Sequence, residues 1–202
     1  MPRRPVLIFA VLVLLIAAGL AGYAWLNRQA GDPQGTGVAL VGGPFTLTDH
    51  NGREVTEKTF LGKYMLVFFG FTFCPDICPT ELQVISAALD QMGPAGEAIQ
   101  PVFITVDPAR DTPDVLKAYL SNFGPRLIGL TGTPEQIAAA AKAYRVYYAK
   151  AANSSADENY MMDHSTIIYL MGPDGRFLRH MPYTTDAAKL AAELKESVTA
   201  SP

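Results

Sequence analysis

The chain has 202 residues, of which 49% are hydrophobic and 17% are charged, and its formal net charge is −3 at pH 7. The apolar residues are concentrated near the start, where residues 5–26 carry no charged side chain, and this argues against a purely cytosolic protein. Arg3, Arg4 and Arg28 lie in or beside that segment, so the rest of the chain has 13 basic and 19 acidic side chains. This acidic balance argues against a nucleic-acid partner, which requires a basic surface.

The apolar segment has the length of a membrane span. As a helix, residues 5–26 would extend about 33 Å, which matches the hydrocarbon core of a bilayer. Arg3 and Arg4 precede the segment, so the positive-inside rule places its start in the cytoplasm and the rest of the chain across the membrane. We therefore expect residues 1–28 to form a single-pass anchor in the inner (cytoplasmic) membrane, with the following domain in the periplasm or extracytoplasmic space. A cleaved signal peptide is the alternative, because the start is basic and small residues follow the apolar run.

After the anchor, the composition predicts a flexible linker over residues 29–43, rich in glycine and polar residues, and one folded domain over residues 44–199. The first half of the domain alternates strands and helices. We expect a hairpin of strands 45–48 and 53–56 around an Asn-Gly turn, a buried strand at 64–71, a helix at 79–92, a strand at 100–106 and a helix that Thr112 caps and Pro113 begins.

The second half of the domain changes character. We expect a strand at 127–130, a helix from Thr133 to about residue 144, an extended segment at 145–149 and a polar loop at 151–162. A hairpin of strands 165–171 and 177–180 around a turn at 172–175, and an amphipathic helix at 185–198, complete it. Buried strands connected by helices, followed by an antiparallel hairpin, predict the α/β class with a mixed sheet flanked by helices.

The only two cysteines, Cys74 and Cys78, lie together in the sequence GFTFCPDICP of residues 70–79. They occupy the point where a buried strand leads into a helix, and the positive end of a helix dipole stabilises the thiolate form. A spacing of four residues on a helical turn places both sulfur atoms on one side. A structural disulfide is the alternative, although it would close only a very short loop. We therefore predict a reactive dithiol or a metal site.

A metal site needs at least one more ligand, and the chain offers His50, His164 and His180. We expect His50, in a turn, and His180, at the end of a hairpin strand, to be surface residues. His164 stands where the polar loop meets a buried strand, and strand ends of α/β sheets carry functional groups. Two thiolates and one imidazole suit Cu(I), while Cu(II) and Zn(II) accept the same donors. An extracytoplasmic site with few ligands favours transferable copper.

For other residues near these positions, a structural and a functional interpretation are both open. Asp163 is a surface carboxylate or a partner that orients His164. Met161 and Met162 are soft donors or packing residues. Asp107 and Arg110 follow the second buried strand, so we expect them on the same side of the sheet as the cysteines, as loop caps or as part of the site surface.

Three motifs, taken in order, resemble those of the Sco (also SenC) proteins: GFTFCPDICP at residues 70–79, VDPARDTP at 106–113 and DHS at 163–165. The match covers residues from about 44 to 198 and lies behind one N-terminal anchor. The resemblance implies a thioredoxin-like fold, with Cys74, Cys78 and His164 as the ligands of one copper ion per chain. It also implies delivery of copper to the dinuclear copper A centre of cytochrome c oxidase, with the copper A subunit as partner and a periplasmic chaperone as copper donor.

Two activities are compatible with this resemblance. A copper chaperone requires Cys74, Cys78 and His164 together, with copper passing by ligand exchange. A thiol-disulfide oxidoreductase, which would keep the copper-binding cysteines of the oxidase reduced, requires only the two cysteines as redox-active thiols. The four-residue spacing and the presence of His164 favour the chaperone over an enzyme. A peroxidase or redox sensor is disfavoured, because no peroxide-activating set of residues is recognisable.

Overall fold

The computed structural model describes residues 19–20, 22, 41–152, 159–184 and 186–200. The chain divides into two units, Met1–Ala39 and Leu40–Pro202, and the elements discussed below belong to the second. Within the described ranges, no helix combines the length and hydropathy that crossing a membrane requires. The predicted anchor (residues 1–28) and linker (29–43) lie almost entirely outside the described residues.

A seven-stranded mixed sheet forms the centre of this unit, in the order β2-β1-β5-β4-β3-β8-β9. Its strands are β1 (Thr46–Asp49), β2 (Glu54–Thr56), β3 (Tyr64–Gly70), β4 (Ile99–Thr105), β5 (Ile128–Thr131), β8 (Ile167–Met171) and β9 (Phe177–Pro182). The three strands β3, β4 and β5 are parallel, and the other neighbours pair antiparallel. The predicted strands and both predicted hairpins are therefore confirmed.

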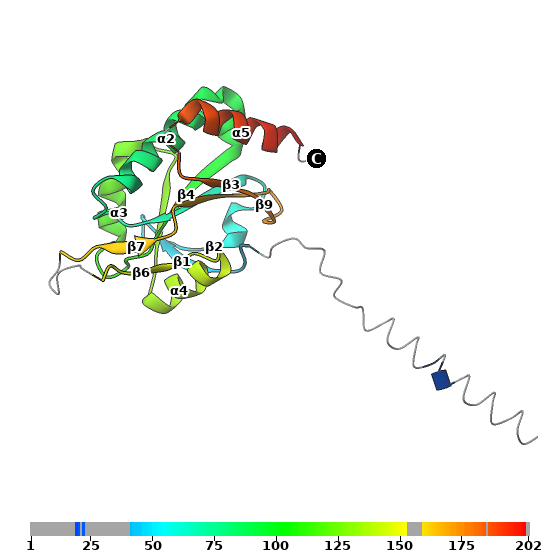
Figure 1. Ribbon diagram of the computed structural model, residues 1–202, viewed down its shortest axis with the longest axis horizontal. Coiled ribbons are helices and arrows are strands. Elements are labelled where there is room, and N and C mark those ends of the chain that lie inside the picture. Colours follow the sequence, from blue (N-terminus) through cyan, green and yellow to red (C-terminus); the bar gives the residue numbers. More distant parts are fainter. Residues whose placement is uncertain (1–18, 21, 23–40, 153–158, 185, 201–202) are drawn as a thin grey trace, which may run out of the picture. The chain divides into compact units, whose positions relative to one another are not determined.

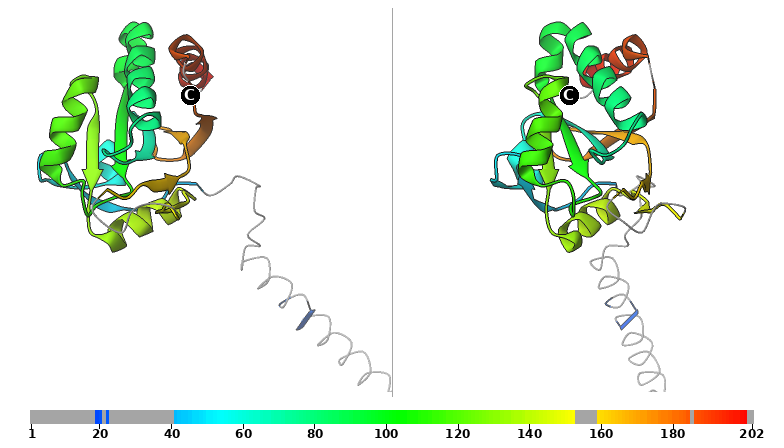
Figure 2. Two further views of the ribbon diagram at one scale, coloured as in Figure 1. Left: turned by 60° about the vertical axis from the view of Figure 1, so that its left-hand side comes forward. Right: turned by 90° about the vertical axis from the view of Figure 1, so that its left-hand side faces the viewer.

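Helices cover both faces of the sheet, as predicted. They are α2 (Ile77–Gln91), α3 (Pro113–Leu120), α4 (Pro134–Ala143) and α5 (Ala187–Ala200), with short 3-10 helices η1 (Glu57–Phe60), η2 (Gly93–Ala98) and η3 (Ser121–Phe123). Helices α2, α3 and α5 lie on one face and α4 lies on the other (Figure 1 and Figure 2). The chain steps from β3 to β4 to β5 in one direction, and right-handed crossovers then place α2 and α3 on the same face.

Strand β3 is the centre of the core, and all seven of its residues are buried. Successive side chains point to opposite faces of a sheet. Phe68 accordingly packs on Phe103, with ring centroids 6.2 Å apart, while Phe69 packs on Tyr144 of the α4 face at 5.4 Å. Burial on both faces explains the continuous apolar run. It also fixes the position of the carboxyl end of β3, from which the cysteine loop departs.

Threonine side chains cap the starts of two helices, and the cap of α3 by Thr112 was predicted. The hydroxyl of Thr112 accepts a hydrogen bond from Val115 N, and Pro113 occupies the first turn of α3. The hydroxyl of Thr133 accepts one from Gln136 N at the start of α4. These side chains satisfy N–H groups that have no partner inside the helix. Each cap therefore fixes where its helix begins.

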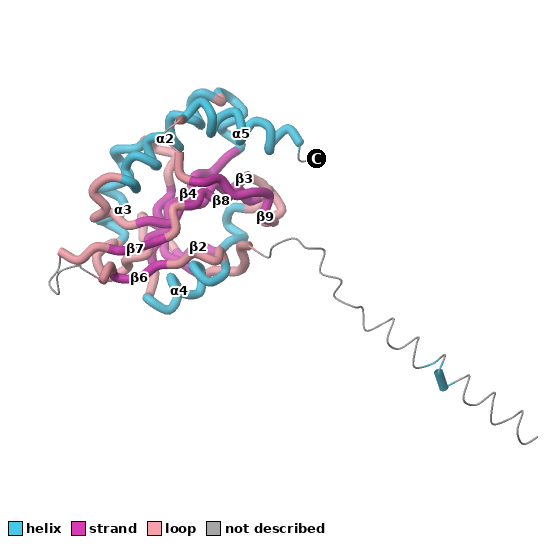
Figure 3. The backbone as a smooth tube through the Cα atoms, viewed as in Figure 1, coloured by secondary structure: helices cyan, strands magenta, loops and turns pink. Residues whose placement is uncertain are grey.

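Two expectations require correction. Helix α2 begins at Ile77 rather than Pro79, so it includes Cys78. The end of the predicted extended segment and the end of the predicted polar loop form a separate two-stranded sheet. In it, β6 (Tyr148–Lys150) pairs antiparallel with β7 (Met162–His164), and Figure 3 shows both as strands. Three-residue strands carry too little alternation to be recognised from sequence. The middle of the predicted loop, residues 153–158, lies outside the described residues.

Candidate metal centre

The two cysteines lie at the junction between β3 and α2, as predicted. Cys74 lies in the connecting loop and Cys78 in the first turn of α2. A Cβ atom on Gly70, the last residue of β3, would lie 2.8 Å from the Sγ atom of Cys78 and 2.8 Å from Cε2 of Phe103. A side chain at position 70 would therefore push Cys78 away from the sheet. The absence of a side chain at Gly70 is what allows the start of α2 to pack against the end of β3.

The two thiols have very different environments. Cys78 is fully buried, whereas Cys74 is half-buried, and the two are not joined by a disulfide. The Sγ atom of Cys74 accepts a hydrogen bond from Cys78 N at 3.4 Å. Hydrogen bonding from the Cys78 thiol and its backbone N–H lowers the pKa of Cys74 to about 5, while that hydrogen bond and burial raise the pKa of Cys78. At neutral pH, Cys74 is therefore a thiolate and Cys78 a thiol.

His164, the last residue of β7, faces Cys78. Its Nε2 atom lies 3.5 Å from the Sγ atom of Cys78. Its Nδ1 atom lies 3.1 Å from the carbonyl oxygen of Ser165, and because a carbonyl only accepts hydrogen bonds, Nδ1 carries the proton. Burial lowers the pKa of His164, so the ring is neutral at pH 7. The Nε2 lone pair is therefore directed toward the buried thiol, as a metal ligand requires.

The donor set fits a soft metal ion. With bond lengths typical of zinc sites, sulfur and imidazole nitrogen ligands of one tetrahedral ion lie about 3.6 Å apart, and Cys78 and His164 have nearly this separation. The described residues contain no three His, Cys, Asp or Glu side chains already placed to bind one ion together. The sulfur of Cys74, which accepts the N–H of Cys78, must turn toward His164 to complete a three-ligand set.

The other two histidines lie away from this centre. The Nδ1 atom of His50 accepts a hydrogen bond from Gly129 N at 2.9 Å, so His50 is a partly buried structural residue rather than the predicted surface residue. His180 is exposed on β9 and stacks on Phe177 with ring centroids 6.3 Å apart. This exposure agrees with its prediction.

Asp107 and Arg110 belong to a cluster that joins three segments. Arg110 pairs with Asp107 at 2.5 Å, and its guanidinium carbon lies 3.8 Å from the ring centroid of Tyr160 and 4.6 Å from that of Phe73. The hydroxyl of Tyr160 donates to Asp107 at 2.6 Å. Phe73 precedes Cys74, and Tyr160 lies four residues before His164. We call these four residues the Arg110 cluster; it connects the cysteine loop to the segment that carries His164.

Asp111 was not singled out from the sequence, yet it anchors the cysteine loop. It is fully buried. Its carboxylate accepts hydrogen bonds from the backbone N–H of Thr72 at 3.0 Å and from the hydroxyls of Thr72 and Thr105, both at 2.5 Å. Burial raises its pKa. An acidic residue shortly after a buried strand is the only local signal, and it does not distinguish Asp111 from Asp107.

Asp163 does not orient His164. It is exposed between two half-buried residues of β7, and the group that fixes the imidazole is the carbonyl of Ser165. Two aromatic rings flank the imidazole instead. Phe68 and Phe71 approach it edge-on, with centroid separations of 6.2 Å and 5.8 Å. These rings form an apolar wall on one side of the imidazole.

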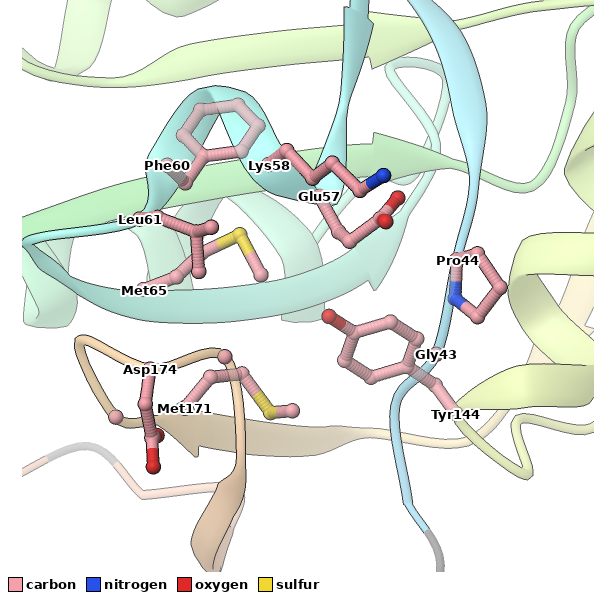
Figure 4. A pocket seen from close by; sticks show the side chains of 12 residues that line it. Gly43, Pro44, Glu57, Lys58, Phe60, Leu61, Met65, Tyr144, Met171 and Asp174 are labelled. Carbon is pink, nitrogen blue, oxygen red and sulfur yellow. The ribbon is translucent and has the colours of Figure 1, made fainter.

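A cavity of about 340 Å³ opens beside the three predicted ligands, with Cys74, His164, Met161 and Met162 in its wall. A second cavity, of about 300 Å³, lies near the opposite end of β3 (Figure 4). Met65, Tyr144 and Met171 line it, and no Cys or His does. The predicted metal ligands therefore lie at the carboxyl end of β3, away from the second cavity.

Comparison with known proteins agrees with this arrangement. The family model SCO1/SenC matches residues 33–199. The chain belongs to the SCO1/SenC family. "Protein SCO2, mitochondrial" of Saccharomyces cerevisiae is 39% identical over 201 residues, which cover 95% of this chain and 66% of that protein. The chain spans about half to two thirds of the length of such mitochondrial relatives.

Solved structures of Sco proteins share the fold. Copper-bound ScoI of Bradyrhizobium japonicum is 48% identical, has a TM-score of 0.71, and the match covers 78% of this chain and 99% of that one. Copper-bound yeast Sco1 is 44% identical, with a TM-score of 0.75 and coverage of 80% and 90%. The predicted thioredoxin-like Sco fold is thus confirmed. Copper, the metal that the sequence favoured, is the metal bound in both structures.

Proposed function

We propose that this Sco protein binds copper at Cys74, Cys78 and His164 and delivers it to the dinuclear copper A centre of cytochrome c oxidase. The observation that carries the proposal is the 3.5 Å approach of His164 Nε2 to Cys78 Sγ, beside a second cysteine in the loop that leads into α2. Two soft sulfur donors and one neutral imidazole suit copper. The copper-bound Sco structures at 48% and 44% identity support this choice of metal.

The unequal burial of the ligands suits transfer as well as binding. Cys78 is fully buried, whereas Cys74 and His164 are half-buried and both line an open cavity. The three residues hold one copper per chain. An incoming partner therefore reaches Cys74 and His164 before Cys78, and Cys74 is the accessible sulfur ligand. Exchange therefore starts at Cys74, where a sulfur ligand of the copper A subunit replaces it.

The proposal includes a membrane location. Residues 1–28 form the anchor, residues 29–43 form the linker, and residues 44–199 form the copper-binding domain on the extracytoplasmic side. The apolar stretch at 5–26 and the two preceding arginines support it. The acceptor is the copper A subunit, and the donor is a copper chaperone of the same compartment. Membrane fractionation and protease access to the domain from the extracytoplasmic side test this part.

The copper site is tested with the full chain, purified in detergent and fully reduced. We expect one tightly bound copper per wild-type chain and transfer to a metal-free copper A domain. Cys78→Ser and His164→Ala should each weaken binding by at least about 100-fold, because each removes a ligand. His180→Ala is the matched control and should bind like wild type. Unchanged binding in His164→Ala would overturn the ligand assignment.

Disulfide reduction is the second candidate, and one observation favours it. Cys74 has a pKa of about 5 and is accessible, while Cys78 is buried behind it, as for an attacking and a resolving thiol. In this reaction the Cys74 thiolate attacks a partner disulfide, and Cys78 then displaces the reduced partner and leaves a Cys74–Cys78 disulfide. Reduction of an oxidised copper A domain that persists in His164→Ala, without stable copper binding by wild type, would favour this activity.

A further inference from the structure

The cavity beside the metal centre contains two sulfur atoms that the proposed ligand set does not use. Met161 and Met162 both line this space of about 340 Å³, together with Cys74 and His164. Both methionines are half-buried and pack against the core. Neither is needed to close the β6–β7 sheet through its side chain, because the pairing of that sheet is made by backbone.

Strand geometry distinguishes the two methionines. Met162 and His164 are separated by one residue in β7, and residues two apart in a strand point to the same face. Asp163 between them is exposed, whereas its two neighbours are half-buried. The pairing of Met162 with Lys150 and of His164 with Tyr148 shows that the alternation is regular there. Met162 is therefore on the imidazole face of β7, and Met161, which precedes the strand, is out of phase with it.

The chemistry of a thioether fits this position. Two thiolates and one imidazole leave a fourth tetrahedral position unfilled. A thioether is a soft, uncharged ligand that selects Cu(I), and a weak methionine ligand tunes the redox potential of copper centres. A methionine side chain is also flexible enough to approach or leave a metal without backbone movement.

We propose that the thioether of Met162 is a fourth, weak ligand that makes this centre selective for Cu(I). The inference rests on the proposed copper binding at Cys74, Cys78 and His164, and it adds the oxidation state that the site favours. Because Met162 and His164 belong to the same short strand, one movement of β7 changes the contacts of both side chains with copper. The binding of Cu(I) therefore depends on the position of β7.

The test compares Met162→Leu with Met161→Leu in the full chain. Leucine keeps a similar volume but removes the sulfur. Chelator competition measures the affinities for Cu(I) and for Cu(II) separately, and redox titration measures the potential of the bound copper. In Met162→Leu we expect about tenfold weaker Cu(I) binding and unchanged Cu(II) binding, which lowers the one-electron potential by about 59 mV. Met161→Leu should remain within about twofold of wild type, because its side chain is out of phase with His164.

X-ray absorption on wild-type protein loaded with Cu(I) gives a measurement that does not depend on a variant folding. Three sulfur scatterers around copper support the proposal, and two sulfur scatterers overturn it. Equal Cu(I) affinity in wild type and Met162→Leu also overturns it, as does a loss confined to Met161→Leu. If wild type itself binds no copper, the proposed function fails, and this outcome is distinct from the loss of Met162 alone.

Discussion

The two halves of the metal centre are held in place by different kinds of structure. The cysteine arm, residues 70–78, continues directly from β3, the most buried strand of the main sheet, and Asp111 ties its backbone to β4. The histidine arm, β6 and β7, pairs only with itself among the described strands. Side chains of the Arg110 cluster join it to the rest. The cysteines are therefore positioned by the main sheet, whereas the position of His164 depends on a few specific side-chain contacts.

The difference predicts which property a substitution disturbs. Changes in the anchor of the cysteine arm remove buried hydrogen bonds next to the core, so they reduce the stability of the whole domain. Changes in the contacts of the histidine arm leave the main sheet intact and displace a ligand. A large loss of stability therefore reports on the cysteine arm, and a loss of copper affinity with a smaller loss of stability reports on the histidine arm.

The largest expected effect is that of Asp111→Ala. It leaves the N–H and hydroxyl of half-buried Thr72 and the buried hydroxyl of Thr105 without their acceptor, and we expect the free energy of unfolding to fall by about 3–5 kcal/mol. Urea denaturation at pH 7 measures it. Asp163→Ala is the control, because that carboxylate is exposed on the histidine arm, and it should change stability by less than about 0.5 kcal/mol. Equal losses in the two variants would contradict the distinction between the arms.

Glu81→Gln probes the helix that carries Cys78. Glu81 is fully buried in α2; its Oε2 atom accepts a hydrogen bond from Thr184 N at 3.3 Å, and its Oε1 atom has no partner within the described residues. Burial raises its pKa from 4.5 to about 7. The folded state therefore binds a proton that the unfolded state has lost, and the resulting stability is present at low pH and disappears as the pH rises through 7.

Wild-type protein should accordingly lose up to about 3 kcal/mol of unfolding free energy between about pH 5 and pH 8. Glu81→Gln should lose much less, since an amide does not ionise. Denaturant titrations at several pH values measure the difference, with the exposed Glu97→Gln as control. A pH dependence that is the same in Glu81→Gln and wild type would show that another group is responsible.

Tyr160→Phe probes the histidine arm. It keeps the ring that stacks on Arg110 but removes the hydroxyl that donates to buried Asp107. We expect a stability loss of about 1–2 kcal/mol, together with about tenfold weaker copper binding as His164 moves away from Cys78. Tyr147→Phe is the matched control, because Tyr147 is 65% exposed. Copper affinity that stays at the wild-type value while stability falls would show that the Arg110 cluster does not position His164.

The pH dependence of copper binding reports on the protonation of the ligands. Cys74 is already ionised above about pH 5 and His164 is neutral at pH 7, so the proton that copper must displace is that of Cys78, whose pKa is raised. Affinity should therefore rise about tenfold per pH unit between about pH 6 and pH 8, because one proton is released per copper. Chelator competition at three pH values measures the slope. A copper affinity that does not change with pH would show that copper does not displace the proton of Cys78.

Much of the fold was predictable because its signals are local. The apolar run of β3, the Asn-Gly turn between β1 and β2 and the capping threonines of α3 and α4 each depend on residues a few positions apart. The same is true of the cysteine pair at the end of β3. The β6–β7 sheet was missed because its strands have three residues each and lie on either side of residues 153–158.

The order of strands and helices could be predicted from the sequence, as could the position of Cys74 and Cys78 at a strand-to-helix junction and the family to which three ordered motifs point. That His164, 86 residues beyond Cys78, faces the buried thiol is visible only in the folded structure. It alone identified Asp111 as the anchor of one arm and Tyr160 as the contact of the other. The physical reason is that periodicity and capping encode contacts between near neighbours, whereas a ligand set closed across the fold depends on how β3, α3 and β7 pack together.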